Sequence, residues 1–200
     1  MLLIEKEGCE LTLHEFEKLT GAKWIPKLEF EDPPVLADIV KSASKLHKKG
    51  EMTLEQMWLG KYFQKEISNC FVPDVAIRWI DPMMGWGVFA LRDFRDMQFI
   101  AEYTGQVRKR RKGDDKNAYC FEYVVAQGFR CPYTIDALDQ GGLGRYINHS
   151  ETPNLNSSLA TFNNVSHVVL YAKGAIAKGT QLCYDYGPDY WSKRTAPSPL

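Results

Sequence analysis

Three short segments contain residue types that could bind a ligand or react with one. Met84–Gly87 has two glycines two positions apart, so its backbone can turn tightly or approach a ligand closely. Arg145–Asn154 is a polar run whose Asn148-His149 pair offers hydrogen-bond donors and acceptors on short side chains. Gln181–Gly187 holds two tyrosines two positions apart, and on a strand these face the same side. The three segments are candidate parts of one site.

Each segment alone also fits an ordinary structural role. The Gly-x-Gly lacks the third glycine and the following helix of a dinucleotide-binding fingerprint, and most such tripeptides are simple turns. Loops rich in Asn, Ser and Pro often cap their own backbone, and a lone histidine in one is usually structural. Tyrosine pairs are common on sheet faces. The order of several motifs along the chain therefore says more than any single motif.

In combination, the chain resembles the SET-domain protein lysine methyltransferases over about residues 74–191. The matching pieces, in order, are Gly85–Ala90, Ala101–Gly105, Tyr133–Ala137, Arg145–Asn154 and Leu182–Gly187. The resemblance implies a mainly β protein with the SET fold, a β-clip of small curled antiparallel sheets with a C-terminal pseudoknot. We expect a helical N-terminal region over 1–70, the SET domain over 71–191 and a C-terminal tail over 192–200.

The resemblance also implies a site with two openings. S-adenosylmethionine would lie in a surface pocket formed by Met84, Gly85, Trp86, Gly87, Tyr119, Asn148 and His149. Within it, Asn148 would bind the methionyl end and His149 would hold the adenine through its main chain. A target lysine would enter from the opposite face through a channel formed by Tyr103, Tyr184 and Tyr186. Tyr186 is the expected catalytic residue, with Tyr103 on the channel wall.

These residue types suit methyl transfer from a sulfonium to an amine. The reaction is an in-line displacement, so the protein must position the reactants, and orientation alone can contribute roughly 7–11 kcal/mol. The attacking lysine must be neutral although its free pKa is about 10.4. An apolar aromatic channel and a nearby sulfonium both disfavour the ammonium form. Tyr184 matches the position that sets the product, and its hydroxyl predicts a product that stops at the mono- or dimethyl stage.

The chain departs from the family pattern where zinc-bearing members have cysteines. Glu151 stands where Cys often follows Asn-His-Ser, and no cysteine cluster flanks the matching region. We therefore expect no metal site and a closer likeness to the short, zinc-free SET proteins, including those encoded by bacteria. Tyr190 and Trp191 could cover the channel in place of zinc, or could form a surface aromatic pair that anchors the tail.

The elements that position these motifs differ between the two ends of the chain. Residues 1–66 predict helices, with Thr-x-x-Glu/Gln capping boxes at Thr12 and Thr53 and helical apolar spacing between Pro33 and Gly50. Leu54, Met57, Trp58 and Tyr62 are expected on one apolar face. From about residue 70 the pattern predicts short strands. They are expected at 75–80, 87–90, 99–103, 119–125, 133–136, 167–172 and 181–186, with a short helix within 139–147.

Composition excludes several classes of protein. The 200 residues include 25 Lys+Arg and 25 Asp+Glu, and this balance argues against a general nucleic-acid binder. No apolar run approaches the roughly 18 residues of a membrane helix. Five scattered cysteines without a Cys-x-x-Cys pair suggest neither zinc nor disulfides. We expect a soluble intracellular protein in a reducing compartment, with the nucleus or chromatin reached only through its substrate.

The basic run 108–112 is the one strong charge cluster. It could be a nuclear address or a DNA contact, but acidic residues follow at once, so a solvated hairpin tip is the better interpretation. We therefore expect no direct nucleic-acid site.

The predicted function is S-adenosylmethionine-dependent methylation of a protein lysine. The resemblance implies a basic partner with an accessible lysine, such as a histone or histone-like protein, and leaves the oligomeric state open. The alternative is a non-catalytic SET fold that serves as a binding or scaffold module. A hydrolase that pairs His149 with Cys120 or Cys183 is remote, because no nucleophile signature is present.

Overall fold

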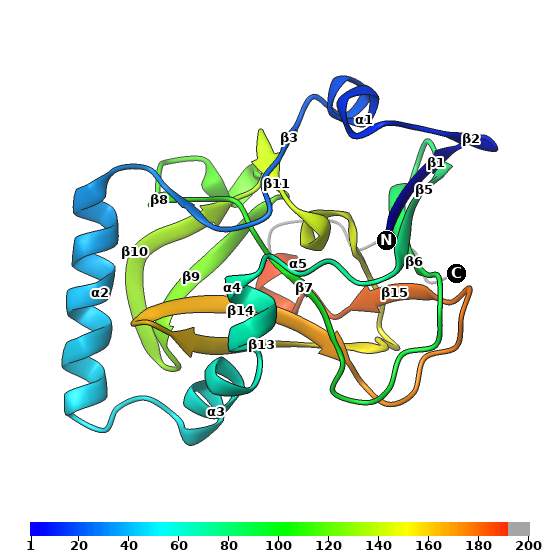
Figure 1. Cartoon of the computed structure of the whole chain (residues 1–200). Coiled ribbons are helices and arrows are strands. Elements are labelled where there is room, and N and C mark those ends of the chain that lie inside the picture. The colour runs from blue at the N-terminus through cyan, green and yellow to red at the C-terminus, as the bar shows by residue number, and fades with distance from the viewer. Residues whose placement is uncertain (192–200) are drawn as a thin grey trace.

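The structure is a computed structural model that describes residues 1–191, and strands make up most of its regular structure (Figure 1). The largest sheet has six strands in the order β12-β15-β6-β5-β1-β2. Its strands are β1 (Leu2–Lys6), β2 (Cys9–Glu10), β5 (Val75–Asp81), β6 (Gly85–Ala90), β12 (Asn148–His149) and β15 (Gln181–Tyr184). The expected mainly β fold is confirmed. The expected tail, 192–200, lies outside the described residues.

Three smaller sheets surround this one, in the orders β4-β8-β10-β9, β13-β14-β7 and β11-β3. Their strands are β3 (Lys23–Trp24), β4 (Glu29–Phe30), β7 (Phe99–Glu102), β8 (Gln106–Lys109), β9 (Cys120–Ala126), β10 (Phe129–Asp136), β11 (Gln140–Gly141), β13 (Leu155–Phe162) and β14 (Val165–Ala172). Figure 1 shows β9 and β10 curling together. Every strand segment that the sequence pattern predicted overlaps an observed strand, whereas β1 to β4, β8, β11, β12 and β13 were not predicted.

The helices lie around the sheets. They are α1 (Leu13–Thr20), α2 (Pro33–Lys48), α3 (Leu54–Tyr62), α4 (Gln64–Ser68) and α5 (Pro188–Trp191), with 3-10 turns η1 (Asp114–Lys116) and η2 (Leu143–Tyr146). The capping box at Thr12 is confirmed, since its side chain accepts from the Glu15 N–H and the Glu15 carboxylate accepts from the Thr12 N–H. The helix expected within 139–147 is only the single turn η2, preceded by β11.

The N-terminal region is not purely helical, which corrects the sequence-based expectation. β1 pairs in parallel with β5, from Leu2 opposite Val75 to Glu5 opposite Arg78. β3 and β4 pair in parallel with β11 and β8. Parallel pairing joins segments far apart in the chain, and these strands are two to five residues long, too short to show a clear alternation. The first 30 residues therefore complete the sheets of the rest of the chain.

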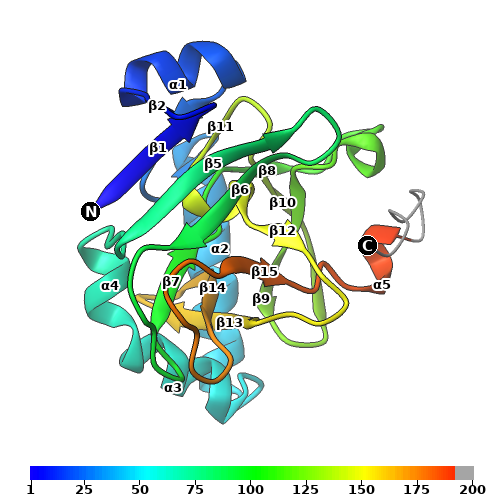
Figure 2. The ribbon, with the colours of Figure 1, turned by 90° about the vertical axis from the view of Figure 1, so that its right-hand side faces the viewer.

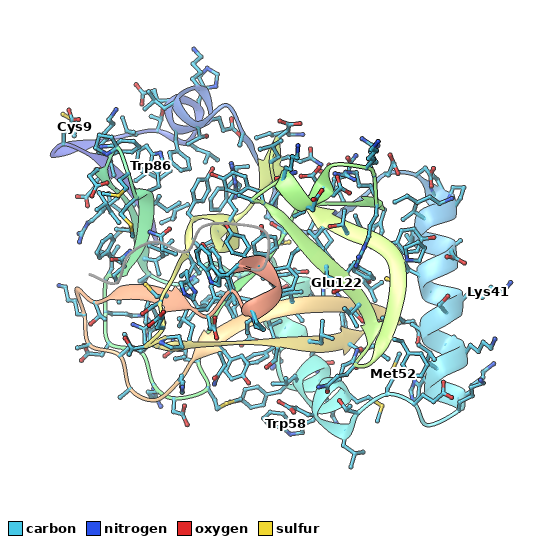
Figure 3. The ribbon with its side chains drawn as sticks, turned by 180° about the vertical axis from the view of Figure 1, so that it is seen from behind. Cys9, Lys41, Met52, Trp58, Trp86 and Glu122 are labelled. Atoms are coloured by element: carbon cyan, nitrogen blue, oxygen red, sulfur yellow. The ribbon has the colours of Figure 1, made fainter. Side chains whose placement is uncertain are left out.

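The face of α3 that packs inward was predicted wrongly. Leu54, Trp58 and Tyr62 are 82%, 51% and 51% exposed, and the Trp58 and Tyr62 rings stack at the surface of the molecule, where Figure 3 shows Trp58 at the outer edge. The buried face contains Gln56, whose amide nitrogen donates to the Val125 carbonyl at 2.9 Å. Gln56 therefore does not close the second capping box, although the Thr53 side chain does accept from the Gln56 N–H.

The basic run 108–112 contains a buried residue, which corrects the solvated-tip interpretation for that position. Arg108 is 4% exposed and donates to the Asp114 carboxylate at 2.8 Å and to Asp136 at 2.7 Å. Its neighbours Arg110 and Arg111 are more exposed and pair with Glu122 and Glu31. A buried charge needs such partners, so Arg108 ties β8 to η1 and β10.

β15, the last strand along the described chain, lies second from one edge of the six-stranded sheet. β15 pairs in parallel with β12, with Asn148 opposite Cys183, and antiparallel with β6 on its other side (Figure 2). The Asn154 side chain fastens the loop after β12 to β15, because its amide donates to the Gln181 carbonyl and its oxygen accepts from the Cys183 N–H. This placement between two earlier segments is consistent with the expected pseudoknot.

Within residues 1–191, no helix is long and apolar enough to cross a membrane. The same residues contain no cluster of three or more His, Cys, Asp or Glu side chains placed to hold a metal ion.

Candidate functional site

A cavity of about 1070 Å³ opens where β6, β9, η2, β12 and β15 meet. Eight of the sequence-predicted site residues line it, namely Met84, Gly85, Trp86, Tyr103, Tyr119, Asn148, Tyr184 and Tyr186. They come from positions 84 to 186, so the fold brings five distant segments together. Gly87 and His149 are not among the lining residues, but they directly follow Trp86 and Asn148, which line the cavity. The large size and the mixture of polar and aromatic walls suit a ligand-binding site.

The turn before β6 forms one end of the cavity. Asp81 fixes this turn, since its carboxylate accepts from the backbone N–H groups of Met83 and Met84 at 2.7 Å. Gly85 has φ +70°, a conformation that other residues rarely adopt. At Gly87 a Cβ would lie 3.3 Å from the Asn148 Nδ2 and closer still to two other side chains. The two glycines thus permit the turn and the close approach of Asn148.

Asn148 and His149 connect this turn to the C-terminal strand. The Asn148 amide donates to the Trp86 carbonyl at 3.2 Å. The His149 Nδ1 accepts from the Tyr186 N–H at 3.2 Å, and the Tyr186 hydroxyl donates to the Ile147 carbonyl at 2.9 Å. His149 therefore positions the backbone of Tyr186.

The three tyrosines expected in the substrate channel are among the aromatic residues that line the cavity. The Tyr184 and Tyr186 rings have centroids 4.7 Å apart, and the Tyr103 hydroxyl donates to the Tyr119 carbonyl at 2.9 Å. Burial raises the pKa of Tyr103, Tyr184 and Tyr186 well above the usual value for tyrosine. All three hydroxyls therefore stay neutral at physiological pH.

The short helix α5 packs against Tyr186. The Tyr190 ring meets Tyr186 edge-on at 4.7 Å, and the Trp191 ring is parallel to Tyr186 at 6.2 Å. Trp191 also contacts the His149 ring at 4.8 Å, and Tyr190 lines the cavity. Of the two interpretations of this pair, the structure therefore supports the one in which it covers the aromatic channel. Figure 2 shows α5 beside the end of β15.

Sequence reasoning missed Arg145 as a site residue. Its side chain lines the cavity, with the guanidinium 4.3 Å from the centre of the Tyr119 ring and 4.9 Å from that of Tyr146. Arg145 is only 9% exposed, and within residues 1–191 its Nε has no hydrogen-bond partner. Its position at the start of the polar run was a signal, but the two flanking rings come from other segments and could not be read from spacing. The Arg145 guanidinium therefore places a positive charge on the cavity wall.

The cavity rim includes the loop that follows β8. Arg110, Arg111 and Lys112 line the cavity, as does Glu122 of β9, which pairs with Arg110. β9 pairs with β10 along one side only, at the end of its sheet. The rim therefore combines an open strand edge with charges of both signs.

The protein is therefore a β protein of small sheets with a ligand-binding cavity where the sheets meet. A glycine turn and a cluster of neutral tyrosines both line this cavity. The sequence model described as the SET domain matches residues 85–187. Because this match covers half of the chain, the chain belongs to the SET domain family.

Curated proteins and solved structures are similar to this chain, and three of them show the extent of the match. Histone-lysine N-methyltransferase Set8 of Drosophila pseudoobscura pseudoobscura is 41% identical over 112 residues, which cover 52% of this chain and 16% of that protein. N-lysine methyltransferase KMT5A of Xenopus tropicalis is also 41% identical over 112 residues, covering 52% and 33%. The crystal structure of Arabidopsis thaliana SUVH6 in complex with SAM has a TM-score of 0.50 at 30% identity, covering 60% of this chain and 30% of that one. This chain therefore spans about a third or less of these proteins.

Proposed function

We propose that this chain is a protein lysine N-methyltransferase that transfers a methyl group from S-adenosylmethionine to a basic protein substrate, such as a histone or histone-like protein. The observation that carries the proposal is the convergence of the glycine turn, Asn148 and three neutral tyrosines on one cavity. The similar proteins named as histone-lysine or N-lysine methyltransferases support the same reaction.

The cavity end at the glycine turn fits S-adenosylmethionine. Arg145 lines the cavity, and its positive charge suits the cofactor's carboxylate. Trp86, Tyr119 and Tyr146 supply aromatic surface, and Asn148 supplies polar groups beside the turn. S-adenosylmethionine, when bound, supplies a sulfonium with a methyl carbon open to attack by an amine. The bound ligand in the similar SUVH6 structure supports this choice of cofactor.

The tyrosine end of the cavity fits a lysine side chain. Tyr103, Tyr184 and Tyr186 surround it with rings and neutral hydroxyls, and this low-dielectric surrounding disfavours an ammonium. The neutral amine that results has a lone pair for attack. The Tyr186 backbone is held by His149 and its hydroxyl by Ile147, so the ring that orients the amine has little freedom.

The proposal also includes a histone or histone-like substrate and, with it, a location. A basic protein would meet a rim that holds Glu122 as well as Arg110 and Lys112, so the rim alone does not select a sequence. A nuclear or chromatin location would follow from a histone substrate.

Two other functions were considered. A scaffold module has no need of the ordered contacts at Asn148, His149 and Tyr186, which favours the enzyme. A cysteine hydrolase is disfavoured because burial raises the pKa of Cys120 to about 11 and also raises the pKa of Cys183. Both cysteines are therefore thiols at neutral pH, and the thiolate is the nucleophile.

Calorimetry with S-adenosylmethionine, followed by transfer of a tritiated methyl group to mixed histones, tests the proposal. We expect binding and transfer by the unchanged protein, and a loss of roughly 100-fold in kcat for Tyr186→Phe, because the hydroxyl that fixes the reacting geometry is gone. Tyr62→Phe, at an exposed tyrosine outside the cavity, should retain full activity. Binding without transfer would favour the scaffold, and undiminished transfer by Tyr186→Phe would contradict the catalytic assignment.

A further inference from the structure

The N-terminal segment 13–25 supports the cofactor end of the cavity from behind. It lies wholly outside the residues that match the SET family, which begin at Gly85. Phe16 of α1 is 1% exposed, and its ring meets the Trp86 ring edge-on at 4.8 Å and the Tyr146 ring at 4.9 Å. Trp86 and Tyr146 both line the cavity, and Figure 3 shows Trp86 close beneath α1. Phe16 therefore packs against two of the aromatic side chains that line the cavity.

The strand that follows α1 fixes the same wall. The Trp24 ring is parallel to the Tyr146 ring at 6.4 Å. β3 pairs with β11, the strand that leads into η2, and the Ile25 N–H donates to the Gly141 carbonyl at 3.3 Å. The Glu17 carboxylate accepts from the Trp24 N–H at 2.8 Å, so α1 and β3 are held together. The whole segment is thus fastened to the chain that carries Arg145.

A chain of contacts runs from Phe16 to the Arg145 guanidinium. Phe16 packs on Tyr146, and the Tyr146 hydroxyl accepts from the Arg145 Nη1 at 3.1 Å. Arg145 in turn lies over the Tyr119 ring. Removing the Phe16 ring would leave a void behind Trp86 and Tyr146 and let both rings turn. In contrast, the tyrosines at the lysine end pack on one another, on Phe121 and on α5.

We propose that Phe16 is a positioning residue for the cofactor end of the site, and that segment 13–25 thereby sets the affinity for S-adenosylmethionine. Phe16 acts through Trp86 and Tyr146, and through Tyr146 on Arg145. This inference rests on the proposed function, because it assigns the glycine-turn end of the cavity to the cofactor. Supporting residues that hold contact residues in place raise affinity by removing the freedom that a ligand must otherwise freeze out.

The test compares Phe16→Ala with Phe63→Ala. Phe63 is also 1% exposed, but it packs on Phe99 and Tyr171 in a separate cluster. We expect Phe16→Ala to raise the Kd for S-adenosylmethionine, measured by calorimetry, on the order of tenfold, with kcat at saturating cofactor and the KM for a histone peptide changed less than about twofold. Phe63→Ala should leave the Kd unchanged, although it creates a void of the same kind.

The possible results distinguish a failure of the proposed function from a failure of the positioning role of Phe16. If the unchanged protein does not bind S-adenosylmethionine, the proposed function fails, whatever the variants do. If it binds and Phe16→Ala binds equally well, or if Phe63→Ala loses as much affinity, the positioning role is overturned. A fall in kcat with an unchanged Kd also overturns it. Phe16→Leu, which keeps most of the buried volume, should show a smaller rise in Kd and replaces the alanine variant if that variant does not fold.

Discussion

Tyr184 lies in the same surroundings as Tyr186, but we expect it to have a different role in the proposed reaction. It is 4% exposed, lines the cavity and lies beside Tyr186. A buried hydroxyl at this point can hold a water molecule and limit how the amine rotates. In the proposed reaction Tyr186 fixes the direction of attack, so removal of the Tyr184 hydroxyl should change the product rather than the rate.

We expect Tyr184→Phe to extend the product from the mono- or dimethyl stage toward trimethyl lysine, because losing the hydroxyl enlarges the space for a methylated amine. Mass spectrometry of a histone peptide over a time course measures the change. Tyr171→Phe is the matched control, since Tyr171 is 5% exposed and its hydroxyl bonds Ser158 outside the cavity. Identical product ladders for Tyr184→Phe and the unchanged enzyme would contradict the role.

At this scale the sequence was informative where a residue's role depends on a local pattern. Tyr103, Asn148 and Tyr186 each stand in a recognisable motif, and all three line the cavity. Arg145 and Phe16 were missed because their roles depend on rings contributed by other segments. Such stacking leaves no spacing signal in a single sequence.

At the scale of the element, the sequence predicted features that depend on short-range contacts but not those that depend on packing between distant segments. The starts of α1 and α2 followed from Thr12 and Pro33, because a capping residue and a proline in the first turn act locally. The orientation of α3 did not follow from its apolar residues. Gly60 explains why, since a Cβ there would lie 1.8 Å from the Thr161 carbonyl oxygen, so α3 lies directly against β13 on its small side. Its larger rings are left at the surface.

Arg108 links three elements, and we expect Arg108→Gln to lower the free energy of unfolding by about 3 kcal/mol, because Asp114 and Asp136 lose their partner. Urea unfolding measures the change. Arg111→Gln is the control, because the Arg111 side chain is 62% exposed and its pair with Glu31 should contribute less than about 1 kcal/mol.

This difference should depend on pH. The hydrogen bond from Arg108 lowers the pKa of Asp114 from its ordinary 3.8. A lowered pKa means that the stabilisation is fully present above pH 3.8 and is lost as the pH falls through the lowered value. The gap between Arg108→Gln and the unchanged protein should therefore shrink in acid. A gap that stays constant from neutral pH to well below 3.8 would contradict the pairing.

At the scale of the whole molecule, strands from before residue 70 pair with strands from after it, so the boundary expected there does not separate two packing units. β1 covers the edge of β5, β3 covers β11, and β4 covers β8. Three apolar residues of α2 pack into the same core cluster as Val107 and Ile135 of the four-stranded sheet. The sequence could not indicate this, because parallel pairs between distant segments carry no local signature.

We expect a fragment of residues 71–191 to lack a cooperative unfolding transition, because three strand edges and much of a core cluster would be exposed. Thermal unfolding followed by circular dichroism tests this, with the full chain as the control. Adding the separate peptide 1–70 should restore part of the transition. A fragment that melts cooperatively on its own would show that the boundary near residue 70 separates independent domains.

The position of β15 has a consequence for the order in which the cavity can assemble. β15 lies between β12 and β6, and Tyr186 comes just after it, so one wall of the cavity depends on a strand that is inserted between two earlier segments. Until β15 is inserted, β6 and β12 have no strand between them, and Tyr184 and Tyr186 have no fixed place on the wall. Folding must therefore bring the two flanking segments and β15 together before the cavity exists.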